Sequence, residues 1–269
     1  MLAPGVPEGH TIHRLARMHR RDLARQPLAV SSPQGRAAAA AAVLDGGSIE
    51  SIDAWGKHLF YRWSTGDTLH VHLGLYGRFR KRASPPSEPR GQIRLRLIGS
   101  DWTGDLSGPI ACELLDPVLE DRLLARLGPD PLRSDPGAFE AFATALGRRR
   151  IPIGAALLDQ KVIAGIGNVY RAELLFLAGM DPRRPARTLA QEEVRALWEA
   201  TALALTAGSR SGRIVTRPKP PWVRRARRGE AVWVYRRVAC GRCGAAVERF
   251  ELALRTMYRC PVCQPDWTG

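Results

Sequence analysis

Two cysteine pairs near the end of the chain, Cys240-Gly241-Arg242-Cys243 and Cys260-Pro261-Val262-Cys263, are separated by sixteen residues. This spacing lets two knuckles on one β-hairpin converge on a single tetrahedral ion. Because four cysteines leave no coordination position open, the pattern predicts one structural Zn²⁺ that folds a segment too small for a core of its own. The last part of the chain is therefore predicted to be a zinc-ribbon β-hairpin.

The surroundings of these cysteines favour a metal and an anionic partner. Paired cysteines in an intracellular protein indicate a metal rather than disulfides, and the fifth cysteine, Cys112, is predicted to be a buried apolar residue of a strand. Arg249, Arg255 and Arg259 make the hairpin basic, as a finger lying on a phosphate backbone requires. A zinc ribbon serves protein contacts equally well, so it does not give the function by itself.

The composition also points to a polyanionic partner. The 269 residues carry a net charge of +15 with a pI near 10.7. Nucleic acid is the commonest partner of such a chain, and a membrane surface is the competing possibility. The length favours two domains plus an appendage. No apolar run approaches the ~18 residues of a membrane span, so a soluble cytosolic protein is expected.

The motif Pro7-Glu8-Gly9-His10 lies close to the start of the chain. A proline at a true N-terminus is a secondary amine that can attack an aldehyde carbon, and the neighbouring carboxylate of Glu8 can move the protons of such a reaction. Residues 1–6 acylate that nitrogen as written. We therefore hypothesise that they are a non-native extension and that translation begins at Val6, from a GTG codon that initiates as methionine. The alternative is a real six-residue extension, with Pro7 merely opening a helix.

Residues 7–120 are predicted to form an N-terminal β-sandwich domain with a flanking helix. Apolar residues at helical spacing from Glu8 to Arg25 predict an amphipathic helix, in which His10 and His13 are interpreted as structural imidazoles. Short alternating segments between Gly and Pro residues then predict a β-sandwich or barrel. The predicted strands are Ser48–Trp55, His58–Ser64, Thr68–His72, Gly77–Arg80, Gln92–Gly99 and Ile110–Leu115.

Two loops of this domain are candidate ligand contacts. Lys57 lies at the tip of a predicted strand pair, where its ammonium can project toward a ligand, although an ordinary solvated turn lysine is the alternative. In His72-Leu73-Gly74-Leu75-Tyr76-Gly77-Arg78, apolar and aromatic side chains stand between flexible glycines, as a wedge into a base stack requires. The alternative is a hairpin whose Leu and Tyr side chains are simply buried.

A hinge is predicted at residues 121–134, followed by a helical domain at 135–229 and the zinc finger at 230–269. The predicted helices are Phe139–Leu146, capped by Asp135 or Ser134, Ile153–Leu158, Asn168–Ala178, and a long helix that reaches about Thr206 from a capping box of Thr188 and Gln191. Gly165 and Gly167 allow tight turns that expose amides before Asn168 to an anion such as a DNA phosphate. Residues 208–229 are either a loop that orders against a partner or a solvated basic linker.

Taken together, these features resemble the formamidopyrimidine-DNA glycosylase/endonuclease VIII (Fpg/Nei) family of bifunctional base-excision repair enzymes. The likeness extends from Pro7 to the end of the chain. Pro7-Glu8-Gly9 resembles the N-terminal nucleophile motif of the family, Leu157–Tyr170 its helix-two-turns-helix, and Cys240–Gln264 its zinc finger. Three motifs in the right order imply a multidomain α+β protein with a β-sandwich, a helix-two-turns-helix domain and a zinc ribbon.

The resemblance also implies roles for single residues. By that resemblance Pro7 is the Schiff-base nucleophile and Glu8 the general acid/base. Lys57 corresponds to the hairpin lysine that contacts the phosphate beside the lesion and serves as a proton donor. Asn168 corresponds to the phosphate-binding asparagine, and Arg255 to the finger arginine five residues before the third cysteine.

The wording of the motifs is closer to the endonuclease VIII branch. Leu75 and Tyr76 resemble the residues that fill the hole left by an extruded base, and Leu-Tyr-Gly and Pro-Glu-Gly are typical of that branch, whereas the other usually has Pro-Glu-Leu. Thr11 is a departure, because many relatives carry a glutamate there, and in this the chain is similar to actinobacterial members.

The resemblance implies a monomeric DNA glycosylase/AP lyase that acts on double-stranded DNA with oxidised bases, pyrimidines foremost, or abasic sites. It also implies a bacterial, nucleoid-associated enzyme of the cytoplasm with no membrane partner. Two alternatives remain open. One is a glycosylase for oxidised purines, since the loop that would select the lesion lies around Thr206–Arg217. The other is a non-catalytic zinc-ribbon protein that binds damaged or abasic DNA, if Pro7 is blocked.

Overall fold

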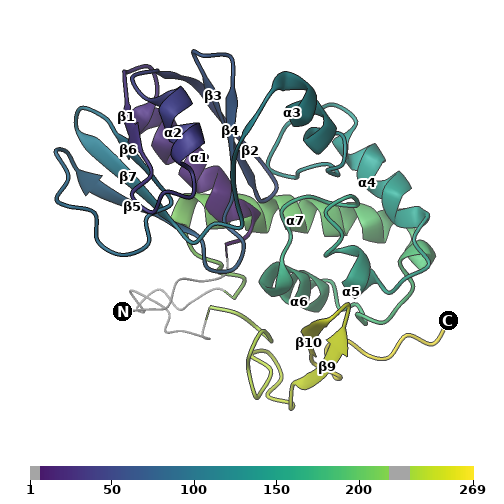
Figure 1. The fold of residues 1–269 in the computed structure, drawn as a ribbon. Coiled ribbons are helices and arrows are strands. Elements are labelled where there is room, and N and C mark those ends of the chain that lie inside the picture. The colour runs from purple at the N-terminus through teal and green to yellow at the C-terminus, as the bar shows by residue number, and fades with distance from the viewer. Residues whose placement is uncertain (1–6, 218–230) are drawn as a thin grey trace. The chain divides into compact units, whose positions relative to one another are not determined.

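The computed structural model describes residues 7–217 and 231–269 (Figure 1). These residues fall into two compact units that divide between Arg126 and Leu127. The predicted extension, residues 1–6, lies outside the described residues, and so does the basic segment from 218 to 230. The division falls within the predicted hinge, while the predicted domain limits themselves stay predictions. No helix in the described ranges is long and apolar enough to cross a membrane.

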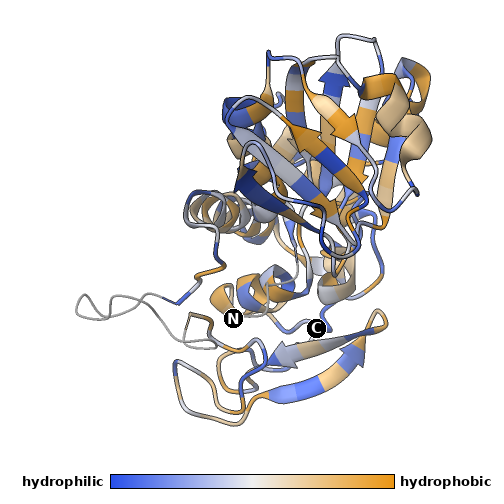
Figure 2. Ribbon diagram, turned by 60° about the vertical axis from the view of Figure 1, so that its left-hand side comes forward, coloured by the Kyte–Doolittle hydropathy of each residue, from blue (hydrophilic) through white to orange (hydrophobic). Residues whose placement is uncertain are grey.

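The first unit is built on two four-stranded antiparallel sheets, in the strand orders β2-β3-β4-β8 and β1-β6-β7-β5. Figure 2 shows hydrophilic and hydrophobic residues alternating along these strands, the pattern of strands with one face in a core. The strands are β1 (Ala29–Ser31), β2 (Ile49–Trp55), β3 (His58–Trp63), β4 (Thr68–His72), β5 (Arg78–Ala83), β6 (Leu95–Ile98), β7 (Trp102–Ser107) and β8 (Ala111–Leu115). The predicted β-sandwich is confirmed.

Helix α1 (Gly9–Leu23) packs on β2 and β3 and adds Ile12 and Leu23 to the core of the sandwich. The short helix α2 (Ala38–Leu44) packs on β1. Cys112 in β8 is half-buried against this core, and burial raises the pKa of its thiol to about 11. The flanking helix and the structural interpretation of Cys112 therefore agree with the fold.

Strands β1 and β7 were not predicted. Strand β7 contains Asp105, a residue type depleted in strands, yet its carboxylate is buried at 1% exposure. The guanidinium of Arg96 in β6 makes this possible, because it donates to both carboxylate oxygens at 2.7 and 3.0 Å. Because a buried ion pair puts a charged residue where an apolar one is expected, the sequence of β7 shows no alternation of apolar and polar residues.

A short helix, α3 (Pro117–Leu124), precedes the division between the units. Asp116 accepts the backbone N–H of Leu119 at 2.8 Å, and Pro117 occupies the first turn, where a missing N–H costs nothing. Glu120 fixes the helix to the sandwich by accepting hydrogen bonds from Arg62 and from the Thr68 hydroxyl. The Asp-Pro pair was a helix-start signal that the proline content of this stretch obscured.

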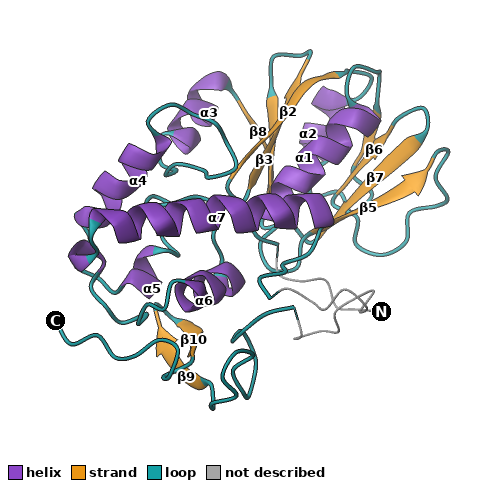
Figure 3. Ribbon diagram, turned by 180° about the vertical axis from the view of Figure 1, so that it is seen from behind, coloured by secondary structure: helices purple, strands orange, loops and turns teal. Residues whose placement is uncertain are grey.

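The second unit is mainly helical and carries the hairpin β9 (Glu248–Leu252) and β10 (Arg255–Arg259) (Figure 3). Its core is shared, because Met257 and Tyr258 of the hairpin join the same apolar cluster as Phe142, Leu175 and Leu197 of the helices. The helices are α4 (Ala138–Gly147), α5 (Ile153–Ala156), α6 (Asn168–Leu177), the 3₁₀ helix η1 (Ala186–Thr188) and α7 (Gln191–Ser211).

Both predicted side-chain caps are wrong. Helix α4 starts after Gly137, which has a positive φ of 73° and no side-chain cap. Helix α7 starts two residues later than the predicted capping box implies, because the Thr188 hydroxyl donates to the carbonyl of Pro185 at 2.8 Å instead of capping a helix. The free N–H of Ala190 is taken by the Glu193 carboxylate at 2.8 Å.

Candidate functional site

Pro7 and Glu8 lead directly into α1. Pro7 is half-buried, the Glu8 side chain is fully buried, and the Glu8 carbonyl accepts the N–H of Thr11 at 2.8 Å. A carboxylate at a helix N-terminus is stabilised by the positive end of the helix dipole. The fold thus places a buried carboxylate one residue from the proline nitrogen, at the start of a helix.

The imidazole of His10, which we interpret from the sequence as structural, is buried. It is 4% exposed, and burial lowers its pKa to about 4, so the ring is neutral near pH 7. The Thr11 hydroxyl lies 3.2 Å from its Nε2 atom. Thr11 therefore interacts with the neighbouring ring through a neutral hydrogen bond.

Lys57 belongs to the two-residue turn that joins β2 and β3, which closes at the pair Trp55 and His58. Gly56, with φ of 56°, supplies the positive dihedral that such a turn requires. His58 is paired with His72 across the sheet, so the Lys57 turn and the loop after His72 lie at the same end of this sheet. Two of the predicted ligand contacts are therefore neighbours in the fold.

The loop after His72 presents Leu75 and Tyr76 to solvent, at 47% and 83% exposure. Gly77 makes this possible, because it donates to the Leu73 carbonyl at 2.9 Å in a turn so tight that a Cβ atom would lie 2.2 Å from that oxygen. Leu73 is the buried member of the loop. The buried-hairpin alternative is thus wrong for Leu75 and Tyr76.

A row of histidines on the face of β3 and β4 that points away from the sandwich core was not predicted. The Glu113 carboxylate accepts from His70 Nδ1 at 3.0 Å, so the neutral His70 ring must accept through Nε2 from His58 Nδ1, 2.9 Å away. Burial, followed by the fields of His72, His70, Lys57 and Arg126, lowers the pKa of His58 to about 3. The signal was present in the alternation of His70 and His72 with apolar residues along one strand.

His72 ends this row beside the Lys57 turn. Its Nδ1 atom accepts the N–H of Gly74 at 3.0 Å, and burial, then the charge of Lys57, lowers its pKa to about 4. The neutral ring therefore carries its hydrogen on Nε2. His72 is half-buried and offers a donor at the same end of the sheet as the lysine charge.

In the second unit, Asn168 lies at the start of α6, after Gly167. Its Nδ2 atom donates to the Thr256 carbonyl in β10 at 3.0 Å, and one further N–H remains on the amide. Arg255, the neighbour of Thr256, is exposed at the start of β10. The two predicted phosphate contacts of this unit are thus held side by side.

The loop before α6 is braced by the Gln160 side chain. Its amide donates to the carbonyls of Leu158 and Ile166 at 2.9 and 3.1 Å and accepts the N–H of Gly165 at 3.0 Å. Gly165 has a φ of 97°, which L side chains rarely adopt. The two-glycine turn therefore opens the helix N-terminus in a fixed conformation, as an anion contact requires.

Arg171 joins these parts and was not predicted. It is fully buried, and its guanidinium donates to Asn168 Oδ1 at 2.5 Å and to the carbonyls of Gly154, Leu252 and Thr256 at 3.0 to 3.3 Å. The residue thus orients Asn168 and fixes the hairpin on α5 and α6. No sequence signal separates it from the many exposed arginines.

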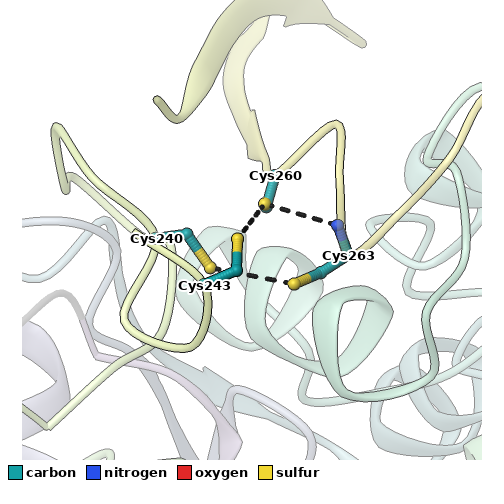
Figure 4. A group of neighbouring side chains, drawn as sticks. All are labelled: Cys240, Cys243, Cys260 and Cys263. Carbon is teal, nitrogen blue, oxygen red and sulfur yellow. Dashed lines mark hydrogen bonds between the residues drawn. The ribbon is translucent and has the colours of Figure 1, made fainter. Parts of the chain in front are cut away.

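The four paired cysteines converge as predicted (Figure 4). All four sulfur atoms lie within 4.8 Å of one another, and the Cys240–Cys263 and Cys243–Cys260 sulfurs are 4.0 and 3.4 Å apart. A tetrahedron with bonds of about 2.3 Å has sulfurs about 3.8 Å apart, so one ion fits. Backbone N–H groups of Arg242 and Cys263 point at Cys240 and Cys260 sulfurs, as thiolates require.

Comparison with known proteins gives a consistent result. The model of the formamidopyrimidine-DNA glycosylase N-terminal domain matches residues 6–103, and that of its H2TH domain matches 127–219. Endonuclease 8 1 of Mycobacterium tuberculosis is 45% identical to the chain, over 96% of this chain and 100% of the relative. The chain belongs to the formamidopyrimidine-DNA glycosylase/endonuclease VIII family.

More distant members of this family share the fold. Formamidopyrimidine-DNA glycosylase of Thermus thermophilus is 35% identical over 84% of this chain and 85% of its own length. A solved complex of Lactococcus lactis Fpg (MutM) with N7-benzyl-Fapy-dG containing DNA superposes with a TM-score of 0.80, over 97% of this chain and 100% of that chain, at 23% identity. The β-sandwich, the helical region and the cysteine cluster are thus those of the family.

Proposed function

We propose that this protein excises oxidised pyrimidines from double-stranded DNA and then cleaves the abasic site through a Schiff base at Pro7. As a family member it is a DNA glycosylase and DNA-(apurinic or apyrimidinic site) lyase of base-excision repair. The single observation that carries the pyrimidine preference is the 45% identity, over the whole relative, to a protein named Endonuclease 8 1. The exposed Leu75-Tyr76 loop supports the extrusion of the damaged base, since a base must leave the stack before Pro7 can reach C1′.

In this mechanism the Pro7 nitrogen attacks C1′ of the extruded nucleotide, the base leaves, and the opened sugar is held as an iminium. Glu8 accepts and returns the protons of these steps, and elimination then cleaves the backbone on both sides of the site. The nitrogen must be a free secondary amine, so the proposal includes the absence of residues 1–6 from the active protein. Lys57 serves as phosphate contact and proton donor.

Phosphate contacts supply the rest of the binding. Asn168 and Arg255 are proposed to hold DNA phosphates, and Leu75 and Tyr76 to fill the gap left by the base. The four cysteines, Cys240, Cys243, Cys260 and Cys263, are proposed to hold one Zn²⁺ that keeps the finger folded and takes no part in proton transfer. Oxidised purines are the second candidate substrate, because named formamidopyrimidine-DNA glycosylases also match the chain at 35% identity.

The test is borohydride trapping on an oligonucleotide with an abasic site, using protein that begins at Pro7 and protein that begins at Met1. A covalent adduct with the Pro7 form alone is expected. The Glu8→Gln variant should still bind but react about 100-fold slower or worse, while Glu50→Gln, on the exposed side of β2, should react normally. No adduct with either form would leave a protein that binds damaged DNA without cleaving it.

Duplexes with thymine glycol and with 8-oxoguanine, compared at equal enzyme concentration, test the lesion class. Faster excision of thymine glycol is expected. The reverse ranking would assign the protein to oxidised purines.

A further inference from the structure

Strand β5 carries a row of three arginines on one face. Arg78, Arg80 and Arg82 occupy alternate positions, so their side chains leave the sheet on the same side. The residues between them point the other way: the Phe79 ring lies edge-on to His19 at 4.7 Å, and Lys81 donates to Asp22 of α1 at 2.6 Å. The arginine row is therefore the outward face of the second sheet.

The row lines a surface hollow of about 310 Å³. Arg90, on the loop before β6, adds a fourth guanidinium, and Tyr76 also lines the hollow. Four arginines thus share the hollow with a single acid, Asp105.

That acid does not neutralise the hollow. Asp105 is 1% exposed, and its two oxygens already accept from Arg96 and, at 3.1 Å, from Arg82. Within the described part of the chain, Arg78, Arg80 and Arg90 form no ion pair, and all three are exposed. Their guanidinium groups are therefore available to an anion.

The spacing of the row fits a nucleic-acid backbone. Alternate residues of a strand are about 6.8 Å apart, and one DNA strand rises about 3.4 Å per nucleotide. The three arginines therefore extend along about four nucleotides. Arg78 follows Tyr76 and Gly77 directly, so the row begins where the exposed wedge ends.

We propose that the outward face of β5, with Arg78, Arg80 and Arg90, binds backbone phosphates of the duplex on one side of the lesion. The inference rests on the proposed function, in which Tyr76 enters the base stack at the damaged pair. With Tyr76 fixed at the damaged pair, the arginine row can reach the duplex on only one side of the lesion. The face thus sets the length of intact DNA that the enzyme needs on that side.

Strand β5 is an edge strand of its sheet, and charged side chains on edge strands also block pairing with other chains. That role needs no ligand and predicts no change in DNA affinity when the arginines are replaced. The two explanations therefore differ in one measurement.

The test compares Arg78→Ala/Arg80→Ala with Arg36→Ala/Arg122→Ala, which removes the same charge from exposed positions in the same unit. Binding is measured by fluorescence anisotropy on two duplexes that carry a tetrahydrofuran abasic analogue near one end or near the other. The Arg78→Ala/Arg80→Ala variant should bind about tenfold more weakly to one duplex and like the wild type to the other. On the affected duplex its salt slope should fall by about two.

Arg78→Lys/Arg80→Lys retains the charge and should keep most of the salt slope, which separates loss of charge from loss of packing. Wild-type affinity on both duplexes, or the same loss on both, would overturn the proposal. Borohydride trapping by the wild-type protein is measured in parallel. Absence of a trapped adduct would refute the proposed lyase activity. The anisotropy result tests the phosphate contacts of the arginine row independently of that activity.

Discussion

Arg171 is a buried cation that holds three segments of the second unit. Its guanidinium donates hydrogen bonds to carbonyls of α5 and the hairpin and to the side chain of Asn168. Replacement by methionine keeps an unbranched apolar stem but removes the guanidinium donor from these acceptors, at about 1–3 kcal/mol for each buried acceptor that is left with no other partner. The position of Asn168 depends on the same bonds.

The Arg171→Met variant should therefore lose a few kcal/mol of unfolding free energy, measured by urea denaturation. Affinity for an abasic-analogue duplex should fall as well, because Asn168 and the hairpin lose their common support. Arg187→Met changes an exposed arginine of the same unit and should alter neither quantity. Wild-type stability of Arg171→Met would show that the guanidinium does not support the hairpin.

His19 makes the sandwich sensitive to acid. Its Nδ1 atom lies 2.6 Å from the Tyr61 hydroxyl, and burial lowers the pKa of the ring to about 4, with Asp22 raising it and Lys81 lowering it further. Between about pH 6.5 and 4 the unfolded chain binds a proton that the folded chain does not. Stability must therefore fall as the pH drops through this window, and the loss becomes constant below the folded pKa.

At pH 5 the unfolding free energy should be about 2 kcal/mol lower than at pH 7.5 because of His19 alone. His19→Asn keeps a polar atom near the Nδ1 position and cannot titrate. This variant should lower the unfolding free energy at neutral pH. In urea unfolding followed across pH, that free energy should decline less steeply toward pH 5, with a slope that corresponds to up to one proton fewer. An unchanged decline would mean that His19 is already protonated in the folded state.

At the scale of elements, the hairpin of the zinc finger is strained at its tip. Ala253 and Leu254 join β9 to β10 with φ values of 55° and 57°, a left-handed turn that suits Asn-Gly. Leu254 is 91% exposed, so its side chain contributes no packing to offset this. The local sequence therefore disagrees with the turn that it forms.

The Ala253→Asn/Leu254→Gly variant should raise the unfolding free energy by about 1–2 kcal/mol, seen as a higher Tm of the zinc-loaded protein. Leu203→Gly, at an exposed position of α7, should instead lower it by about 1 kcal/mol, because its backbone is helical. Equal destabilisation by both would show that the turn is not strained.

Elements with a clear apolar period could be predicted, and those fixed by buried charge could not. Strand β4 was predicted with its limits because Leu69 and Val71 alternate with polar residues. Strand β7 depends on the Asp105–Arg96 pair, and α7 starts where Glu193 finds the Ala190 N–H. Such contacts join residues whose proximity only the fold creates.

The candidate site divides in the same way. Pro7 and the cysteines stand in motifs with their own spacing, and the resemblance to the family indicated Lys57, so the sequence predicted these candidates. Arg171 and the histidine row act through buried partners on other strands and helices, and their residue types are common elsewhere in the chain. Local patterns thus indicate the groups that we propose meet the ligand, and they miss the buried groups that hold their surroundings in place.

For the whole molecule, the four-cysteine site, proposed to hold zinc, joins the hairpin to the helices of the second unit. Cys240, Cys260 and Met257 belong to the core of the second unit, and Gln264 ties the second knuckle to the Met180 carbonyl at 2.8 Å. Among the described residues, the core of the first unit is formed by residues between Ile12 and Leu114. Loss of the metal should therefore loosen the second unit and leave the first one folded.

Treatment with a strong zinc chelator at pH 7 should speed amide hydrogen exchange in β9, β10 and α6, while β2–β4 keep their protection. Affinity for DNA should fall sharply, because Arg255 and Asn168 lose their common scaffold. Cys260→Ser should reproduce both effects without chelator, whereas Cys112→Ala, outside the cluster, should not. Protection lost equally in both units would show that they unfold as one and that the zinc ion stabilises the entire chain.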